Sequence, residues 1–512
     1  MAKLFELQII KGVYFRSLSE GNRIRRITLP APRGKILARG GEVLVDNVRQ
    51  EKKIVFNPSG YEKVDELQEA GEAEIIVDWK RTYLLAEKMA HISGYLGEVG
   101  PEELGMVDPL CTEKGPRKIG SLVGRGGLEE QYNCALSGID GEQLVEVDTA
   151  GNKIRLLGKR EPLKGDDIKT TIDCPLQKKT AELMEGKTGA VLVTDTRGEI
   201  LALVSSPSYD PNVFISQNNP AEIERIINND VLPLFNRAIA GLYHPGSVFK
   251  QVVSVAALEE GVIDEDFIYN DEGQIVLKTP YGTYEYNNWY FTQNGGKEGE
   301  IGLVRAIARS TDTFFYKIGG MMGIDALVKW SNKFGLGGKS GIDIPGEIAG
   351  LVPSPEWKEA VKGEKWFTGN TYHMSIGQGD LATSPVLVNS ITSVIASGGY
   401  LCRPHLVGQE RCENLNIKRQ NLDLVREGMK GACSTGGTGY TFFDADPKVG
   451  CKTGTAETFE KDVTHAWFTF FAPVDKPEIT VTVFVEKGGE GSSVAGPIAR
   501  DIFNFWKTQK EP

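Results

Sequence analysis

His244-Pro-Gly-Ser-Val-Phe-Lys250 is the stretch that decides the fold, because it places a serine and a lysine three residues apart at the start of an apolar helix. At that spacing Ser247 and Lys250 lie on one face of the first helical turn. A serine hydroxyl is a poor nucleophile until a base takes its proton, and a lysine can be that base if burial keeps its amine neutral. The stretch is typical of serine acyl-transfer chemistry without a catalytic histidine.

The surrounding residues strengthen a signal that is weak alone. Pro245-Gly246 interrupts the preceding chain and predicts that the helix begins at Ser247, with its N–H groups facing the place where an acyl oxygen gains negative charge. Residues 251–258 are apolar nearly all round, as in a buried central helix. We therefore expect a buried Lys250, although the bare spacing also fits a helix start with a solvated lysine.

Length and charge limit the class of protein. A chain of 512 residues predicts about two to four domains, and 40% hydrophobic residues are enough for a real core. The net charge of −11 argues against nucleic acid as a partner, because phosphate binding needs a basic surface. No run approaches about 18 apolar residues, so no transmembrane helix is predicted.

The seven cysteines are spread along the chain with no C-x-x-C pair, and the five histidines are scattered, so no zinc site is expected. An odd, dispersed set fits buried free thiols better than a disulfide framework, with one or two bridges left open as an alternative. Cys451 is expected to be a small packing residue.

The order of the predicted elements indicates an α+β protein. In the N-terminal third, strands are expected at 35–37 and 41–45, helices at 61–71, 80–91 and 128–136, and a hairpin at 143–155. Beyond residue 165, strand pairs are expected at 189–193 with 199–204 and at 465–471 with 478–485, and a closing helix at 497–506. Strands at both ends with helices between them imply one sheet assembled from distant segments.

Two further motifs follow Ser247. Ser310-Thr-Asp312 stands in an apolar helical context, and Lys452-Thr-Gly-Thr455 precedes the last strand pair. Each motif alone is common by chance, because Lys187-Thr-Gly189 and Ser208-Tyr-Asp210 match the same patterns. In the order S-x-x-K, S-x-D, K-T-G the three motifs are jointly strong, and this trio occurs in penicillin-binding proteins and class A β-lactamases.

Longer motifs occur in both halves of the chain. The N-terminal ones are Ala31-Pro-Arg-Gly34, His91-Ile-Ser-Gly-Tyr95, Gly127-Leu-Glu-Glu130 and Glu146-Val-Asp148. The C-terminal ones are Ser206-Pro-Ser-Tyr-Asp-Pro211, Leu234-Phe-Asn-Arg-Ala238, Tyr243-His-Pro-Gly-Ser247, Gly341-Ile-Asp343 and Ser375-Ile-Gly-Gln-Gly379. Along nearly its whole length the chain resembles the class B penicillin-binding proteins. Aspartate rather than asparagine at 312 points to their elongation-type branch, penicillin-binding protein 2.

This resemblance implies an extended N-terminal pedestal, or dimerisation-type domain, over residues 1–165. A penicillin-binding transpeptidase domain would follow over 166–512, with helices flanking an antiparallel sheet and a helical subdomain. The stretch from Asn47 to His91 is short for the family, so a reduced pedestal head is expected. The family's membrane anchor precedes a segment like Leu4–Gly12. A location on the extracytoplasmic face of the bacterial inner membrane is therefore implied, with an N-terminal anchor absent from this chain.

The implied activity is peptidoglycan D,D-transpeptidation in cell elongation and shape maintenance. Ser247 would attack the D-Ala-D-Ala amide of a stem pentapeptide and hold the acyl group until an amine from a neighbouring strand completes the cross-link. Lys250 would be the general base and Ser310 the proton relay. Asp312 would position Lys250, and Lys452 would tune the relay electrostatically.

The resemblance also implies the substrate-binding residues. Thr453, Gly454 and Thr455 would bind the terminal carboxylate, and the N–H groups of Ser247 and Thr455 would form the oxyanion hole. No cofactor is implied. Some members of the branch carry a metal site between the first two motifs, but residues 251–309 contain no Cys or His, so none is predicted.

The implied partners are the stem pentapeptide, β-lactam antibiotics, a SEDS-family glycosyltransferase and elongation-complex scaffold proteins. Three alternative functions stay open: a D,D-carboxypeptidase, a β-lactamase-like hydrolase, and a non-catalytic β-lactam sensor or scaffold. No clear deacylating base is visible for a β-lactamase, and intact Ser247, Lys250 and Lys452 speak against a scaffold that has lost its chemistry.

Overall fold

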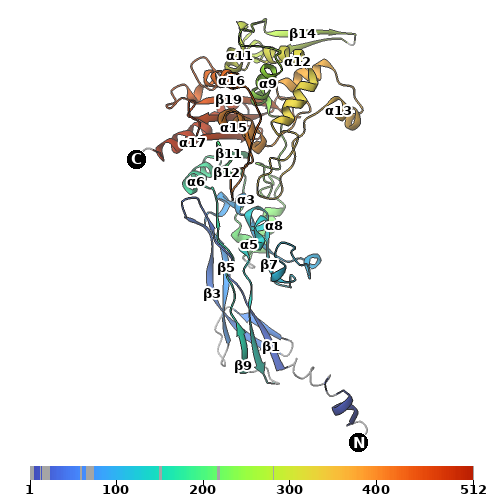
Figure 1. The fold of residues 1–512 in the computed structure, drawn as a ribbon, viewed down its shortest axis with the longest axis vertical. Coiled ribbons are helices and arrows are strands. Elements are labelled where there is room, and N and C mark those ends of the chain that lie inside the picture. The colour runs from blue at the N-terminus through green and yellow to red at the C-terminus, as the bar shows by residue number, and fades with distance from the viewer. Residues whose placement is uncertain are drawn as a thin grey trace.

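A computed structural model of the chain describes residues 5–11, 13, 23–57, 60–64, 74–148, 153–215, 219–280 and 282–510. The molecule is elongated, with a narrow β-rich pedestal that carries a broader C-terminal domain (Figure 1). Helices and strands are mixed, so the predicted α+β class is confirmed. Among the described residues, no helix combines the length and the apolarity that crossing a bilayer requires.

Antiparallel strands make up most of the pedestal. One sheet has the order β1-β8-β9, and the other joins β10, β2, β3 and β4, with β5 paired to β3. Their bounds are Ile24–Leu29 (β1), Ile36–Leu37 (β2), Val43–Asn57 (β3), Gly60–Val64 (β4), Glu74–Tyr83 (β5), Gly141–Val147 (β8), Lys153–Arg160 (β9) and Ile168–Lys169 (β10). Alternate side chains face a small core of Ile27, Leu29, Ile54, Ile76, Val145 and Val147. The predicted strand pairs at 35–45 and 143–155 are confirmed.

The helices predicted at 61–71 and 80–91 are wrong. Residues 60–64 and 74–83 are strands β4 and β5, and residues 65–73 lie outside the described part of the chain. Helical backbone within 80–91 is limited to a 3-10 turn at Ala86–Lys88 and the start of α3 (Ala90–Ser93). The long ladder to β3 overrides the local propensity of these charged segments, because a strand beside a small core needs only one apolar face.

A buried ion cluster ties the pedestal strands to the helical turns above them. Glu129 lies on α4 and is fully buried, and its two carboxylate oxygens accept hydrogen bonds from Arg33 Nη2 and Arg81 Nε at 2.7 Å each. Arg81 Nη1 also donates to Gly34 O at 2.7 Å. Neighbouring elements are β6 (Tyr95–Glu98), β7 (Leu122–Arg125), α4 (Gly127–Gln131), α5 (Asn133–Leu136) and the 3-10 turns Pro101–Glu103 and Thr112–Lys114. The helix predicted at 128–136 is thus two short helices.

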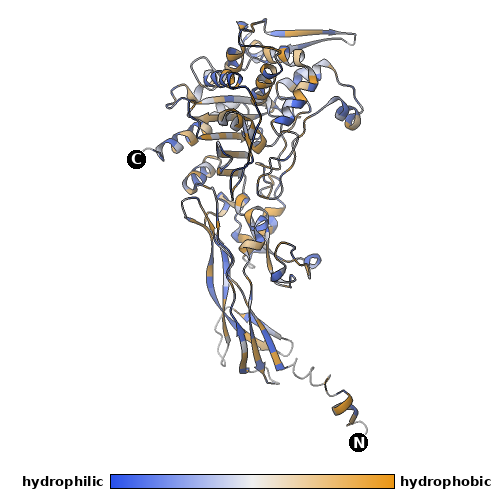
Figure 2. Cartoon of the chain, in the orientation of Figure 1, coloured by the Kyte–Doolittle hydropathy of each residue, from blue (hydrophilic) through white to orange (hydrophobic). Residues whose placement is uncertain are grey.

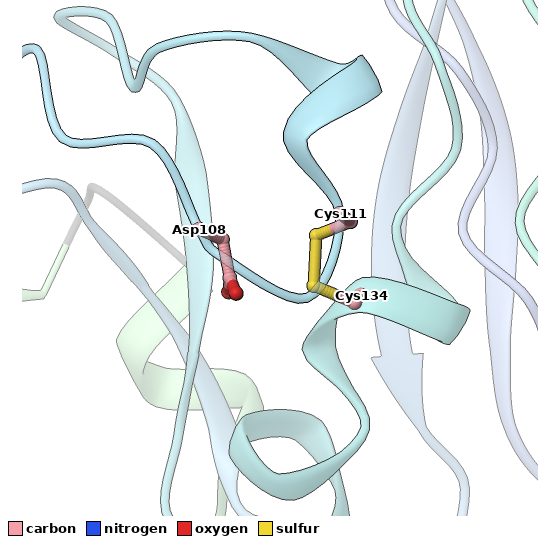
Figure 3. A group of neighbouring side chains, drawn as sticks. All are labelled: Asp108, Cys111 and Cys134. Carbon is pink, nitrogen blue, oxygen red and sulfur yellow. A yellow bond between two sulfur atoms is a disulfide. The ribbon is translucent and has the colours of Figure 1, made fainter.

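Six of the seven cysteines form disulfides, Cys111–Cys134, Cys402–Cys412 and Cys433–Cys451, and Cys174 is a buried free thiol. The prediction of mainly free thiols is wrong, and so is that of Cys451 as a mere packing residue. The partners lie 10 to 23 residues apart in sequence, so the tertiary fold brings them together. Asp108 lies beside Cys111 and Cys134 (Figure 3), but their disulfide leaves no thiolate to bind a metal ion.

The C-terminal domain is built on a five-stranded antiparallel sheet of order β12-β11-β21-β20-β19. Its strands are Gly189–Asp195 (β11), Ile200–Ser206 (β12), Gly450–Glu457 (β19), Thr464–Ala472 (β20) and Ile479–Val485 (β21). The two predicted strand pairs are confirmed, and Val191 pairs with Val483, so distant segments do assemble into one sheet.

Helices cover both faces of this sheet. Ala190 and Leu192 of β11 pack in one core with α9 (Lys250–Glu259) and α15 (Pro385–Ser397). Val191 and Val193 pack in another with α6 (Cys174–Leu183) and α17 (Gly496–Thr508). A strand covered on both faces reads as a continuous apolar run, as the hydrophobic colour of the central strands illustrates (Figure 2).

A helical subdomain surrounds α9 on the side of the sheet away from the pedestal (Figure 1). Its helices are Leu303–Arg309 (α11), Asp312–Lys333 (α12), Thr368–Ser375 (α14) and Arg419–Ala432 (α16). Other elements are Asn212–Ile215 (α7), Pro220–Ile227 (α8), Trp289–Asn294 (α10), Pro355–Lys362 (α13), Tyr269–Asp271 (β13), Gln274–Thr279 (β14), Gly282–Asn287 (β15), Gly299–Ile301 (β16), Tyr400–Cys402 (β17) and Cys412–Asn414 (β18). The β14–β15 hairpin projects from this end of the molecule.

Candidate active site

Ser247 lies in a 3-10 turn, Gly246–Phe249, and the α-helix α9 begins only at Lys250. The predicted helix start at the serine is therefore three residues early. A Cβ at Gly377 would lie 2.1 Å from Gly246 O, so a glycine at 377 allows the loop before α15 to run against this turn. Ser247 is partly exposed, and no described residue hydrogen-bonds its Oγ.

Lys250 is fully buried one turn further on. Its Nζ donates to Ser310 O at 2.8 Å, to Ser310 Oγ at 3.2 Å and to Asp312 Oδ1 at 2.6 Å. An ammonium group has three N–H donors, so these acceptors use all of them. The expected burial of Lys250 is confirmed, and the solvated alternative is excluded.

The break between α11 and α12 brings the three acceptors to one point. Ser310 ends α11 with a left-handed φ of 54°, and α12 begins at Asp312. A non-glycine residue in this conformation costs on the order of 1 kcal/mol, and such strain clusters at functional sites. Asp312 is held from its other side, because its Oδ2 accepts a hydrogen bond from Trp289 N at 3.0 Å.

Lys452 approaches Ser310 from the sheet. It lies on the edge strand β19 and is fully buried, and its Nζ donates to Ser310 Oγ at 2.8 Å and to Thr453 O at 2.9 Å. Ser310 Oγ therefore lies between two amines, 3.2 Å from that of Lys250 and 2.8 Å from that of Lys452. The structure joins Lys250, Ser310, Asp312 and Lys452 in one hydrogen-bonded cluster, although 142 positions separate Ser310 from Lys452.

Burial changes the acidity of both amines. Burial lowers the pKa of Lys250 below the ordinary lysine value, and the Asp312 carboxylate opposes that change. Burial also lowers the pKa of Lys452 well below the ordinary value, and the nearby Lys250 ammonium lowers it further. Two amines that compete for protons in one dry cluster favour a state in which one is charged and the other is neutral.

The predicted carboxylate-binding residues follow Lys452 along β19. Thr453 Oγ1 donates to Thr438 Oγ1 at 2.9 Å. A Cβ at Gly454 would lie 3.1 Å from Val248 Cγ1 and 3.2 Å from Pro245 O, so the strand passes directly against the serine turn. Thr455 is exposed on this edge. Since β20 covers only one side of β19, the other side leaves backbone groups available to a bound peptide.

Sequence reasoning missed several residues of this site. Asn288 Oδ1 accepts a hydrogen bond from Asp312 N at 3.1 Å, and Trp289 N holds the carboxylate of Asp312. The disulfide between Cys433 and Cys451 anchors β19 at the residue before Lys452. An Asn-Trp dipeptide has no recognised functional pattern, and nothing in the sequence marks its nearness to Asp312.

The chance copies of the motifs, at Lys187-Thr-Gly189 and Ser208-Tyr-Asp210, lie away from this cluster. Gly189 of the Lys187 triplet begins β11, as expected of an ordinary turn that enters a strand. Ser208 Oγ donates to Glu87 O at 2.8 Å, where the C-terminal domain meets the pedestal. Order and context therefore separated the motifs of the cluster from their copies.

Comparisons with known proteins agree with this geometry. The family model of the penicillin-binding protein transpeptidase domain matches residues 188–504, and that of the penicillin-binding protein dimerisation domain matches residues 61–170. The peptidoglycan D,D-transpeptidase MrdA of Haemophilus influenzae is 32% identical over 590 residues, covering 99% of this chain and 89% of that protein.

Solved structures share both domains. Penicillin-binding protein 2 in a complex with MreC from Helicobacter pylori aligns with a TM-score of 0.82 and 26% identity, over 95% of this chain and 99% of that one. A chain from a structure titled for the coordination of polymerization and crosslinking by a peptidoglycan synthase complex aligns with a TM-score of 0.80 and 27% identity, over 99% and 96%. The chain belongs to the penicillin-binding proteins and is a peptidoglycan D,D-transpeptidase of the penicillin-binding protein 2 type.

Proposed function

We propose that Ser247 is the nucleophile of this transpeptidase and that the Lys250–Ser310–Asp312–Lys452 cluster moves its proton. The observation that carries the proposal is the position of Ser310 Oγ between two buried amines, one of them a single turn from Ser247. A base must be able to become neutral, and the lowered pKa of both lysines supports that requirement.

The cluster provides a path by which Lys250 becomes neutral. A proton passes from the Lys250 ammonium to Ser310 Oγ while the Ser310 hydroxyl gives its own proton to Lys452. The neutral Lys250 keeps two N–H donors, enough for Ser310 O and Asp312, and gains a lone pair. That lone pair accepts the Ser247 proton as Oγ attacks the carbonyl carbon of the D-Ala-D-Ala amide.

The same path returns a proton to the leaving group. When the tetrahedral intermediate collapses, the C–N bond breaks and D-alanine leaves as an amine that must gain a proton. Ser310 gives it that proton and is reprotonated by Lys250 or Lys452. The acceptor amine of a neighbouring stem peptide then attacks the Ser247 ester by the reverse sequence, so each proton is returned.

The edge of β19 would hold the substrate during these steps. The terminal carboxylate of the stem peptide would bind to the hydroxyls of Thr453 and Thr455 beside Gly454, and the charged amine of Lys452 would attract it. The N–H groups of Ser247 and Thr455 would donate to the developing oxyanion. These roles are supported by the passage of the edge strand against the serine turn.

We further propose a SEDS-family glycosyltransferase and an MreC-like scaffold as partners, and a location on the extracytoplasmic face of the inner membrane. The complex of the Helicobacter pylori protein with MreC supports the scaffold partner, and the peptidoglycan synthase complex that coordinates polymerization and crosslinking supports a polymerising partner, whose SEDS-family identity rests on the family resemblance. The location has independent support in the three disulfides, because disulfides persist in oxidising compartments and are rare in the cytosol.

Fluorescent penicillin tests the nucleophile directly. The parent protein should become labelled, Ser247→Ala should not, and Ser208→Ala, in the chance copy of the S-x-D motif, should label as the parent does. Absence of label on the folded parent, or full labelling of Ser247→Ala, would contradict the proposal.

The fate of the adduct separates transpeptidation from the alternatives. An adduct that lasts for many minutes disfavours a β-lactamase, whereas rapid turnover favours one. A stem pentapeptide offered with and without an acceptor amine then distinguishes a cross-linked product from simple D,D-carboxypeptidase hydrolysis. A non-catalytic sensor would acylate and form neither product.

A further inference from the structure

Asp271, at the end of β13, is a buried carboxylate beneath the active site that no cation pairs with among the described residues. It is 1% exposed. Its Oδ1 accepts hydrogen bonds from Gly273 N at 2.9 Å and Thr313 Oγ1 at 2.6 Å. Its Oδ2 accepts from Glu298 N at 3.0 Å and Asn288 Nδ2 at 3.3 Å. Burying a carboxylate that only neutral donors surround costs free energy, so we expect this carboxylate to have a specific role.

Asn288 links this carboxylate to Asp312. Its side chain is fully buried, with Nδ2 toward Asp271 and Oδ1 accepting a hydrogen bond from Asp312 N. Rotating the amide by half a turn would place its oxygen against the Asp271 carboxylate, so the anion fixes the direction of the amide. The next residue, Trp289, donates its backbone N–H to Asp312 Oδ2.

Asp271 also holds the helix that carries Asp312. Its bond from Thr313 reaches the first turn of α12, one residue beyond Asp312. Asn288 N donates to Gly273 O at 2.8 Å, so Asp271 and Asn288 close the base of the projecting β14–β15 hairpin. The carboxylate that contacts Lys250 is therefore positioned through both its backbone and its side chain by one continuous set of hydrogen bonds.

We propose that Asp271 and Asn288 are positioning residues for transpeptidation, which hold the Asp312 carboxylate against Lys250 without contacting substrate. The proposal rests on the roles given above to Lys250 and Asp312. Without this support, Asp312 would no longer be fixed at 2.6 Å from Lys250 Nζ, and the geometry of proton transfer to Ser310 would loosen.

Asn288→Ala is the main test, with acylation by fluorescent penicillin measured as a rate against pH. A small misplacement of catalytic groups can slow a reaction by about 10- to 100-fold, and we expect a loss in that range. The charged groups that face Lys250 are Asp312 on α12 and Lys452 on β19, with Ser310 between them. A loosened Asp312 no longer stabilises the Lys250 ammonium, so the pKa of Lys250 should fall. The pH at which the acylation rate begins to rise should therefore be lower than in the parent.

Asp271→Asn provides a second variant of nearly the same size, in case Asn288→Ala does not fold. In either orientation its new N–H₂ group would face donors that now bond the carboxylate, so the same slowing and the same direction of shift are expected. The double variant should be no slower than the slower single variant, because the two residues act as one unit. Asn270→Ala is the matched control, since Asn270 is exposed and its side chain bonds only Glu272 among the described residues.

Two results would overturn the proposal. One is a folded variant whose rate and pH profile match those of the parent. The other is a lowered melting temperature with an unchanged pH profile, which would indicate a purely structural role. Lys250→Arg, measured in parallel, distinguishes failure of the positioning proposal from failure of the proposed function. If Lys250→Arg is acylated at the parent rate, the proposed role of Lys250 is wrong, whatever the result for Asn288→Ala.

Discussion

The buried ion cluster of the pedestal and the cluster of the active site each contain two basic side chains and one carboxylate. In the pedestal, Arg33 and Arg81 each give Glu129 a hydrogen bond of 2.7 Å. In the active site, Asp312 forms an ion pair with only one of the two lysines, Lys250, and a serine hydroxyl separates the two amines. Guanidinium groups stay charged at any ordinary pH, whereas a buried lysine amine can lose its proton. The choice of arginine or lysine as the basic residue thus distinguishes a structural anchor from the proposed proton relay.

The largest effect is expected from replacing the titratable base by a permanent cation. Lys250→Arg should lower the rate of acylation by about 10³-fold, because a guanidinium cannot accept the Ser247 proton. The rate of fluorescent-penicillin labelling measures this, with folding checked by circular dichroism. Lys187→Arg, in the chance copy of the K-T-G motif, is the control. Acylation by Lys250→Arg within tenfold of the parent would remove the distinction between the two clusters.

Breaking the ion cluster of the pedestal should lower stability and leave the rate of acylation unchanged. Glu129→Gln leaves two buried arginines without their anion, which should lower the free energy of unfolding by about 3–5 kcal/mol. The folded fraction should still acylate at the parent rate. Urea unfolding measures the loss, and Glu142→Gln, whose partner Arg26 is 71% exposed, should change stability by about 1 kcal/mol or less. A stable Glu129→Gln variant with slowed acylation would contradict this assignment.

The disulfides allow the pedestal and the active site to be compared through a smaller loss of stability. Converting both cysteines of Cys433–Cys451, or both of Cys111–Cys134, to serine should each lower stability by about 2–4 kcal/mol. Only the first pair should also slow acylation, because Cys451 precedes Lys452 on β19. Thermal unfolding and labelling rates on the two double variants test this, and equal labelling rates would show that the strand needs no covalent anchor.

The last prediction removes the second amine of the active-site cluster. Lys452→Met removes the group that takes the proton of Ser310 and attracts the substrate carboxylate, so labelling by fluorescent penicillin should slow by about 100-fold. A lysine with a lowered pKa binds fewer protons in the folded than in the unfolded chain between its folded-state pKa and the ordinary value of 10.5, so stability rises with pH within that window. Lys452→Met should flatten that rise in pH-dependent urea unfolding. Labelling of Lys452→Met at the parent rate would mean that Lys452 takes no part in the proton relay.

Much of the C-terminal domain could be predicted from the sequence, because its strands and helices have clear periodicities. β11 and β21 are uninterrupted apolar runs, which is what a sheet covered on both faces requires. The strands of the pedestal were harder to predict. Glu74–Tyr83 mixes charged and apolar residues, and its strand identity depends on pairing with β3, which lies about 30 residues earlier in the chain, so no local pattern reports the pairing.

The site residues divide in the same way. Lys250, Ser310, Asp312 and Lys452 stand in short motifs with fixed spacing, so pattern and order were enough to select them. Asn288, Trp289 and Asp271 act through single hydrogen bonds across 17 to 42 positions, and the cysteine pairs also depend on tertiary neighbours. Such contacts arise only when helix α12 and the β13–β16 region pack together, which no local pattern reports.

The length of β3 also has a mechanical consequence. Fifteen residues at about 3.3 Å each make a rod of roughly 50 Å, and strand β9 of the pedestal and helix α9, which follows the turn of Ser247, lie toward opposite ends of the molecule (Figure 1). The pedestal is thus a spacer of defined height. Deleting two residues from β3 and two from the facing β5 would preserve which side chains point inward while shortening the spacer by about 7 Å. The distance between the base of the pedestal and the active site would then depend on the number of residue pairs between two strands that have no chemistry of their own.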